Sequence, residues 1–232
     1  MATLVLKINY TKSLDRAAKS VRYHAFRTRE VPIDERGMFN RSTDHADIKA
    51  FIRSLDDPLT RDRTTRGGRV IQPPKMHRLM FSLRRRDFVA CGFTSWKPVI
   101  REALESFERE QGIKLDWVAA EHLSATHPHA HVDVKSVYTA PDGTRHRLVI
   151  TQDMRLALKA AVERVIERER TRADEERRQQ RAFDKAVRDL TMALVRGLRE
   201  AGRADERETD SLVHRRPKRR PQPDRDTDDR GR

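Results

Sequence analysis

Four of the nine histidines of the chain fall within ten residues, in the segment HLSATHPHAH at 122–131. The stretch HAHVDVK that begins at His129 alternates polar and apolar residues, which is typical of a β-strand. Successive side chains of a strand point to opposite faces, so His129 and His131 point the same way, about 7 Å apart along the strand. Two imidazoles at that spacing can bind one ion. Neutral imidazole is the commonest protein ligand for divalent transition metals.

His122 ends the preceding predicted strand and joins this pair if the two strands are neighbours. His127 has the wrong parity for the same face, so we do not expect it to be a ligand. Three imidazoles without a thiolate leave one coordination position open, as catalytic metals require, whereas a structural zinc site is normally closed by a fourth ligand. The sequence therefore predicts a three-histidine site for a divalent metal ion (Mg, Mn or Zn), with its identity left open.

A tyrosine is the second candidate for chemistry. The chain has three tyrosines, and Tyr23 lies on a predicted helix over 14–29, opposite the apolar stripe of that helix. Lys19 and Arg27 stand four residues before and after it, so they share its face and favour a phosphate there. The alternative is an amphipathic surface tyrosine that stacks on a neighbour.

The remaining pattern describes the elements that must position these residues. Apolar alternation predicts strands, and a 3.6-residue period predicts helices. We expect an α+β fold with a central, mostly antiparallel five-stranded sheet flanked by helices, in a domain over 1–151. The predicted strands are 3–10, 77–83, 115–121, 129–138 and 145–150, and the predicted helices are 14–29 and 96–111. We take Ser13 and Ser95 as the helix caps and Gly112 as a helix stop.

Three further segments are more polar. Residues 57–75 read as an Arg-rich loop, in which Arg66 is a candidate for contacts with a DNA backbone. Residues 152–201 predict a long, charged helical extension, and an apolar stripe returns at Phe183. Residues 202–232 are rich in proline and charge and poor in apolar residues, so we expect a disordered basic tail.

Composition indicates a polyanionic partner. The formal net charge is +14 and the sequence pI is about 10.5, an excess of Lys and Arg that suggests nucleic acid. Cys91 is the single cysteine, so no disulfide can form within the chain. No apolar run approaches the roughly 20 residues of a membrane span, and the first residues are too quickly polar for a signal peptide. These features predict a cytoplasmic protein without membrane insertion.

Taken together, the motifs resemble a known family. HLSATHPHAHVDV has the form HxxxxHPHxHhxh and resembles the third motif of the conjugative relaxases, the mobilisation nucleases of the HUH superfamily. VRYHAFRTRE resembles the tyrosine motif of their plasmid mobilisation branch (MobA/VirD2-like), and MHRLMFSL resembles its middle strand. The likeness covers about residues 1–150, and the motifs occur in the family's order.

The resemblance implies an enzyme, a metal-dependent DNA endonuclease and transesterase. Tyr23 would attack a phosphodiester of single-stranded DNA, remain joined to the 5′ phosphate and release a 3′ hydroxyl, while the histidines hold the cation. His77 would orient a ligand or contact phosphate. The family often has acidic residues where this chain has Ser124 and Thr126. Either Asp133 or Glu121 would take over the role of orienting a histidine, and Tyr10 is the fallback nucleophile.

The resemblance also implies partners. These are single-stranded DNA at an origin of transfer, relaxosome accessory proteins and a type IV coupling protein, with transfer into a recipient cell alongside the DNA. The segment HRRPKRRP resembles the basic signals read by type IV secretion systems, although a nonspecific nucleic-acid tail fits equally. Two other functions stay open: an HUH replication initiator or transposase, and a catalytically silent DNA-binding accessory protein of the same fold.

Overall fold

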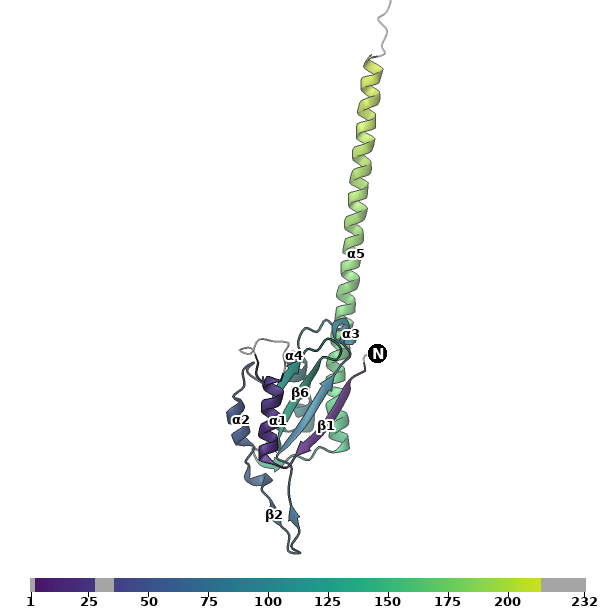
Figure 1. The fold of residues 1–232 in the computed structure, drawn as a ribbon. Coiled ribbons are helices and arrows are strands. Elements are labelled where there is room, and N and C mark those ends of the chain that lie inside the picture. Colours follow the sequence, from purple (N-terminus) through teal and green to yellow (C-terminus); the bar gives the residue numbers. More distant parts are fainter. Residues whose placement is uncertain (1–2, 28–35, 214–232) are drawn as a thin grey trace, which may run out of the picture. The chain divides into compact units, whose positions relative to one another are not determined.

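A five-stranded antiparallel sheet forms the centre of the fold (Figure 1). The computed structural model describes residues 3–27 and 36–213. The strand order is β1-β4-β6-β5, and β7 pairs with the C-terminal end of β6, at residues 137–139. The strands are β1 Val5–Thr11, β4 Met76–Ser82, β5 Lys114–His122, β6 His129–Thr139 and β7 Arg145–Arg147. The predicted α+β class and the antiparallel five-stranded sheet are confirmed.

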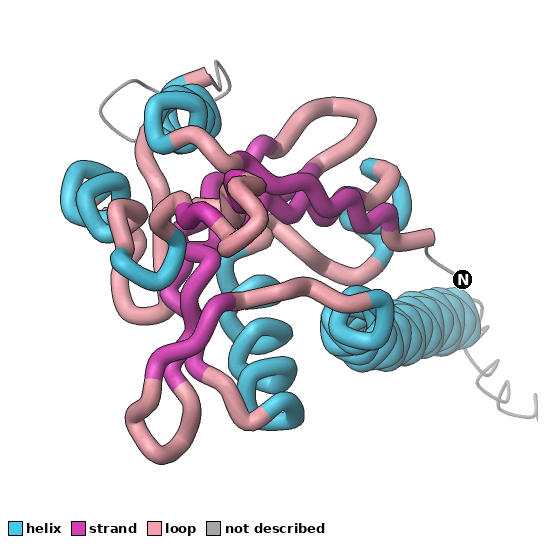
Figure 2. The backbone as a smooth tube through the Cα atoms, turned by 90° about the horizontal axis from the view of Figure 1, so that it is seen from below, coloured by secondary structure: helices cyan, strands magenta, loops and turns pink. Residues whose placement is uncertain are grey.

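Different helices cover the two faces of this sheet (Figure 2). Helices α1 (Leu14–Phe26) and α2 (Ile48–Ser54) pack on one face, where the core includes Val21, Phe51 and Val118. Helix α4 (Lys97–Gln111) and the first turns of α5 (Gln152–Val213) pack on the other. We call these the α1 face and the α4 face. Because helices cover both faces, β6 buries Ala130, Val132 and Val134 on the α4 face and Asp133 on the α1 face, while His129 and His131 are partly buried.

Local signals account for the helix ends. The side chain of Ser13 accepts a hydrogen bond from the Arg16 N–H, so it caps α1 as predicted. Gly112 ends α4 with φ 61° and ψ 40°, a left-handed conformation that glycine adopts without strain. Ser95 accepts from the Lys97 N–H, although Trp96 occupies the cap position of α4. The predicted end of the first helix at residue 29 lies outside the described residues.

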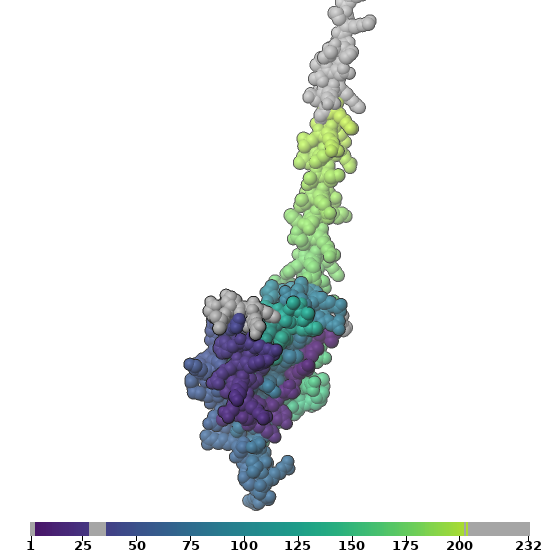
Figure 3. Space-filling model, in the orientation of Figure 1, coloured from purple at the N-terminus to yellow at the C-terminus, as the bar shows by residue number. Residues whose placement is uncertain are grey.

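The Arg-rich segment 57–75 is more structured than predicted. It contains the short helix η2 (Pro58–Thr60) and a hairpin of β2 (Arg63–Thr64) and β3 (Val70–Ile71). The hairpin lies at the end of the domain away from α3 (Arg85–Ala90) (Figures 1 and 3). Strands of two residues are too short to show alternation, and helices α2 and α3 are too short to show a clear helical period in the sequence.

Helix α5 is longer than the predicted extension. It continues to Val213, so residues 202–213 are helical where a disordered tail was expected, and residues 214–232 lie outside the described residues. Residues up to Arg177 form one compact unit and residues from Arg178 form a second. The core of the first unit includes Leu158, Val162 and Ile166. The sequence-based boundary at residue 151 thus separates elements that pack together.

The second unit carries an exposed apolar stripe. Its large exposed side chains include Phe183, Val187, Leu190, Leu194 and Leu198, which recur at the three- and four-residue spacing of one helix face. Among the described helices, none has both the length and the apolar composition needed to cross a membrane.

Candidate active site

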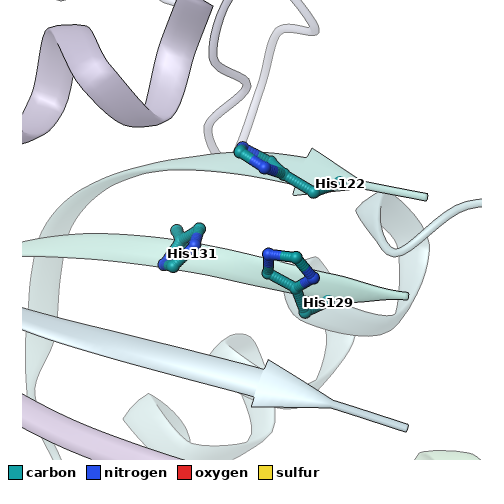
Figure 4. A group of neighbouring side chains, drawn as sticks. All are labelled: His122, His129 and His131. Carbon is teal, nitrogen blue, oxygen red and sulfur yellow. The ribbon is translucent and has the colours of Figure 1, made fainter. Parts of the chain in front are cut away.

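The three predicted ligand residues lie together on the α1 face of the sheet. His122, the last residue of β5, is paired directly with His129 of β6, and His131 is paired with Ala120. Figure 4 shows His129 and His131 on one strand and His122 on its neighbour. One ring nitrogen from each histidine lies within 4.8 Å of the other two, and the ring centroids are 5.0–5.2 Å apart. We call this group the histidine cluster.

Backbone hydrogen bonds fix which ring nitrogens of the cluster are free. The Nε2 of His122 lies 3.0 Å from the carbonyl oxygen of His24, and the Nδ1 of His129 lies 2.9 Å from that of His127. A carbonyl oxygen only accepts, so both nitrogens must be donors. In the neutral rings, the lone pairs that can bind a cation are therefore those of the His122 Nδ1 and the His129 Nε2. Metal-binding histidines typically use the second ring N–H in this way, so the cluster fits a divalent cation.

The electrostatics of the cluster favour neutral rings. Burial, together with smaller effects of nearby His24, His129 and Arg27, lowers the pKa of the His131 imidazole to about 2. Burial also lowers the pKa of His122, against a raising effect of its hydrogen bond to His24. The imidazoles of His122 and His131 are therefore uncharged at neutral pH, which is the form that binds a cation.

Tyr23 lies on the last turns of α1 and is 50% exposed. Its ring centroid is 4.8 Å from the Arg27 guanidinium, which lies over the ring, and 6.1 Å from the ring of His24. The tyrosine lines an open hollow of about 680 Å³ together with Arg22, Phe26, Arg27 and Arg36. A phenol with cationic neighbours on an open surface is accessible to a phosphate backbone. Lys19, the other predicted cation of this face, is exposed as well.

Three of the other predicted site residues lie elsewhere. The His77 imidazole is buried on the α4 face, where its Nε2 bonds to the Leu148 carbonyl, so the prediction that it orients a ligand or contacts phosphate is wrong. The Glu121 carboxylate is also on that face and accepts from the Trp96 N–H at 2.7 Å. It caps α4 and does not orient a histidine, which corrects that prediction. Arg66 is exposed near the turn of the hairpin, at the opposite end of β4 from the cluster.

The fallback nucleophile is remote from the cluster. Tyr10 is exposed at the end of β1 and is paired with His77, whereas His131 is paired with Met80, opposite Lys7. Three residues of strand, about 10 Å, therefore separate Tyr10 from the level of the cluster. Tyr10 is four residues after Leu6 on the same strand, so the two side chains point to the same side of the sheet, the α4 face. Tyr23 is the better placed of the two tyrosines.

Asp133 contacts His24, a residue outside the predicted metal site. Its carboxylate is completely buried on the α1 face, and its Oδ2 lies 2.8 Å from the Nδ1 of His24. Its hydrogen bond goes to His24 and not to one of the three cluster histidines, so any effect of Asp133 on a metal ligand would act through His24. His24 itself had a detectable signal, because it lies three residues after Val21 and seven after Ala17. A histidine on that apolar stripe must be buried and paired.

Comparisons with known proteins support the architecture. No family model matches the chain, and no curated protein sequence matches it. Among solved structures, the metal-bound complex of the conjugative relaxase TrwC with oriT DNA is similar, with 13% identity, a TM-score of 0.51, and coverage of 75% of this chain and 70% of that one. A copper-bound complex of TrwC gives the same identity and coverage with a TM-score of 0.52. This chain has a relaxase-like fold. At this identity the likeness concerns the fold alone.

Proposed function

We propose that this protein is a relaxase, which nicks and rejoins one DNA strand at an origin of transfer. The observation that carries this proposal is the exposed Tyr23 on the helix that packs against the histidine cluster. The ring of Tyr23 lies next to that of His24, and the ring of His24 stacks on that of His131. His24 therefore links the candidate nucleophile to the histidine cluster. This arrangement lies on a fold shared with a protein that was solved in complex with oriT DNA.

The proposed reaction is a transesterification. The phenolic oxygen of Tyr23 attacks phosphorus, the bond to the 3′ oxygen breaks, and a 5′-phosphotyrosyl link forms. The phenol loses one proton and the 3′ oxygen gains one. One phosphoester replaces another, so the reverse reaction can rejoin the strand without an external energy source.

The surrounding residues bind and orient the substrate. His122, His129 and His131 would hold a divalent cation, which when bound offsets the negative charge of the scissile phosphate. Arg27 lies over the Tyr23 ring and can contact an adjacent phosphate oxygen. The exposed arginines of the β2–β3 hairpin can bind the DNA backbone elsewhere, without reading sequence.

The test is covalent capture. The protein is incubated with labelled single-stranded oligonucleotides from candidate origins and Mg²⁺ or Mn²⁺, and the adduct is resolved on a denaturing gel. We expect an adduct that is lost in Tyr23→Phe and after chelation of the metal, and retained in Tyr10→Phe, the matched exposed tyrosine. An adduct that survives Tyr23→Phe contradicts the assignment. DNA binding without an adduct for any origin favours the silent accessory protein.

Sequencing the captured oligonucleotide distinguishes a transfer origin from the origin of an HUH replication initiator or the end of a transposon. The proposal also places the protein in the cytoplasm. It further includes contacts with relaxosome proteins or a type IV coupling protein, and transfer into a recipient cell. The basic segment HRRPKRRP, within residues 214–232, lies outside the described residues.

A further inference from the structure

His24, the residue after the proposed nucleophile, is buried at the interface of α1 with β6. It is 7% exposed and shares its helix face with Ala17, Val21 and Ala25. Its Nδ1–H donates to the wholly buried Asp133 carboxylate at 2.8 Å. The other buried positions of this helix face, Ala17, Val21 and Ala25, are apolar, so a polar pair here costs desolvation that its hydrogen bond must offset.

The same residue contacts two members of the histidine cluster. The rings of His24 and His131 are stacked, with centroids 4.1 Å apart and planes inclined by 5°. The backbone carbonyl of His24 accepts the Nε2–H of His122 at 3.0 Å. One residue of α1 thus fixes the plane of one imidazole and the tautomer of another.

Stability alone does not account for the pair. The second carboxylate oxygen of Asp133 has no hydrogen-bond partner among the described residues, and the same holds for the Nε of Arg78. Arg78 is directly opposite Asp133 in the β4–β6 register, and its Nη1 reaches Ser20 at 3.5 Å. Polar groups left partly unsatisfied weaken a core. Apolar residues of similar volume at such a site often give equal or greater stability.

We infer that His24 and Asp133 are positioning residues for the cation site, an inference that deepens the proposed function and rests on it. Asp133 holds the His24 ring, and that ring holds His131 by stacking. The His24 carbonyl leaves the Nδ1 of His122 available to the cation. Because Tyr23 is the adjacent residue of the same helical turn, the contacts that order the ligands also fix the nucleophile beside them.

The test replaces the polar pair by aliphatic side chains of similar total volume, His24→Leu with Asp133→Ala, which also removes the ring stacked on His131. Each protein is titrated with Co²⁺ and followed by visible absorption, which reports both affinity and coordination, and the metal-free protein is melted separately. We expect a Kd for Co²⁺ that rises about 10- to 100-fold, with a changed absorption spectrum. The metal-free melting temperature should stay equal to that of the wild type or rise.

Val21→Ala is the matched control, because Val21 is fully buried one turn earlier in the same interface. It should lower the melting temperature and leave Co²⁺ affinity and spectrum unchanged. If the double variant does not fold, His24→Asn serves in its place. Its amide nitrogen can keep the bond to Asp133 while the stacked ring is lost, and the same fall in Co²⁺ affinity is expected.

The outcomes separate this inference from the function on which it rests. A double variant that binds Co²⁺ with wild-type affinity and spectrum overturns the positioning role alone. A wild-type protein that binds Co²⁺ through the cluster but forms no DNA adduct contradicts the proposed function and leaves the positioning role supported, provided the variants lose affinity. A wild-type protein that binds no cation overturns both.

Discussion

The two faces of the central sheet are formed by the same strands and yet bury different kinds of residue. On the α4 face, β6 presents Ala130, Val132 and Val134 to a core of aliphatic and aromatic side chains. On the α1 face, the residues between them are His131 and Asp133, and Asp133 is as deeply buried as its apolar neighbours. Burial of polar groups costs free energy unless they are paired. The α4 face thus mainly stabilises the fold, and the α1 face accommodates the proposed chemistry.

The largest effect is expected from moving a carboxylate between the faces. Val132→Asp would place a charge one residue from Asp133 but on the α4 face, without a partner such as His24. The effective penalty for a buried unpaired ion is several kcal/mol, comparable to the whole stability of a typical domain, about 5–15 kcal/mol. Circular dichroism should show an unfolded or barely stable protein, whereas Val132→Ile should fold. Melting of Val132→Asp within a few degrees of the wild type would contradict the comparison.

A crossed pair of alanine variants should separate the two faces. Phe81→Ala removes a fully buried ring from the α4 face and should cost about 3–5 kcal/mol of unfolding free energy, with Co²⁺ affinity unchanged. His129→Ala removes a partly exposed ligand from the α1 face, so Co²⁺ affinity should fall by about 100-fold or more. Its metal-free denaturation midpoint should hardly move. Urea denaturation and Co²⁺ titration of both variants check this. If each variant lowered stability and Co²⁺ affinity to the same extent, the two faces would not have separate roles.

Acid should destabilise the metal-free protein through both faces. Burial lowers the pKa of His77 on the α4 face and of His131, to about 2, on the α1 face. The unfolded chain binds these protons near pH 6.5, whereas the folded chain binds them only at lower pH. Stability is therefore complete above about pH 6.5 and falls as the pH drops, by up to about 1.4 kcal/mol per pH unit for each histidine. Urea midpoints between about pH 4 and 8 measure the slope.

His131→Asn removes one of these titrating groups and should make that slope shallower by up to one proton. His77→Asn gives the corresponding change on the α4 face. A slope that neither variant alters would mean that these two histidines do not control the acid sensitivity.

The smallest effect concerns Glu121. Its carboxylate accepts hydrogen bonds from Ser95 and from the Trp96 N–H at the start of α4. Glu121→Gln should cost about 1 kcal/mol, because the charge is lost but one acceptor oxygen remains. Co²⁺ affinity should equal that of the wild type. A clear loss of Co²⁺ affinity in this variant would mean that Glu121 influences the metal site, and that the α4 face also contributes to cation binding.

Strand alternation predicted the geometry of the cluster well. Polar and apolar residues alternate from His129 to Lys135, so the sequence alone places His129, His131 and Asp133 on one face. The proximity of His122 followed from a short connector between adjacent strands. Both inferences needed only local geometry, and the structure brings the three imidazoles together.

The roles of His77, Glu121 and His24 could not be predicted in the same way. β4 is buried on both faces, with Met76 on one and Leu79 and Phe81 on the other, so alternation does not reveal where His77 points. The contact of Glu121 depends on how α4 docks against β5. The partner of His24 lies 109 residues away and depends on the packing of α1, although its place on the apolar stripe already marked it as buried.

The burial pattern along α5 has a consequence for how the gene can vary. Ala173 is the last described side chain of this helix that is buried, and every described side chain from Asp174 to Ala201 is exposed. A chain that ends after Arg177 would keep the described core intact, whereas one cut at residue 151 would lose Leu158, Val162 and Ile166. Recombination in the codons after Arg177 can therefore replace the C-terminal segment, and with it any binding specificity of that segment. No residue of the described core would have to change.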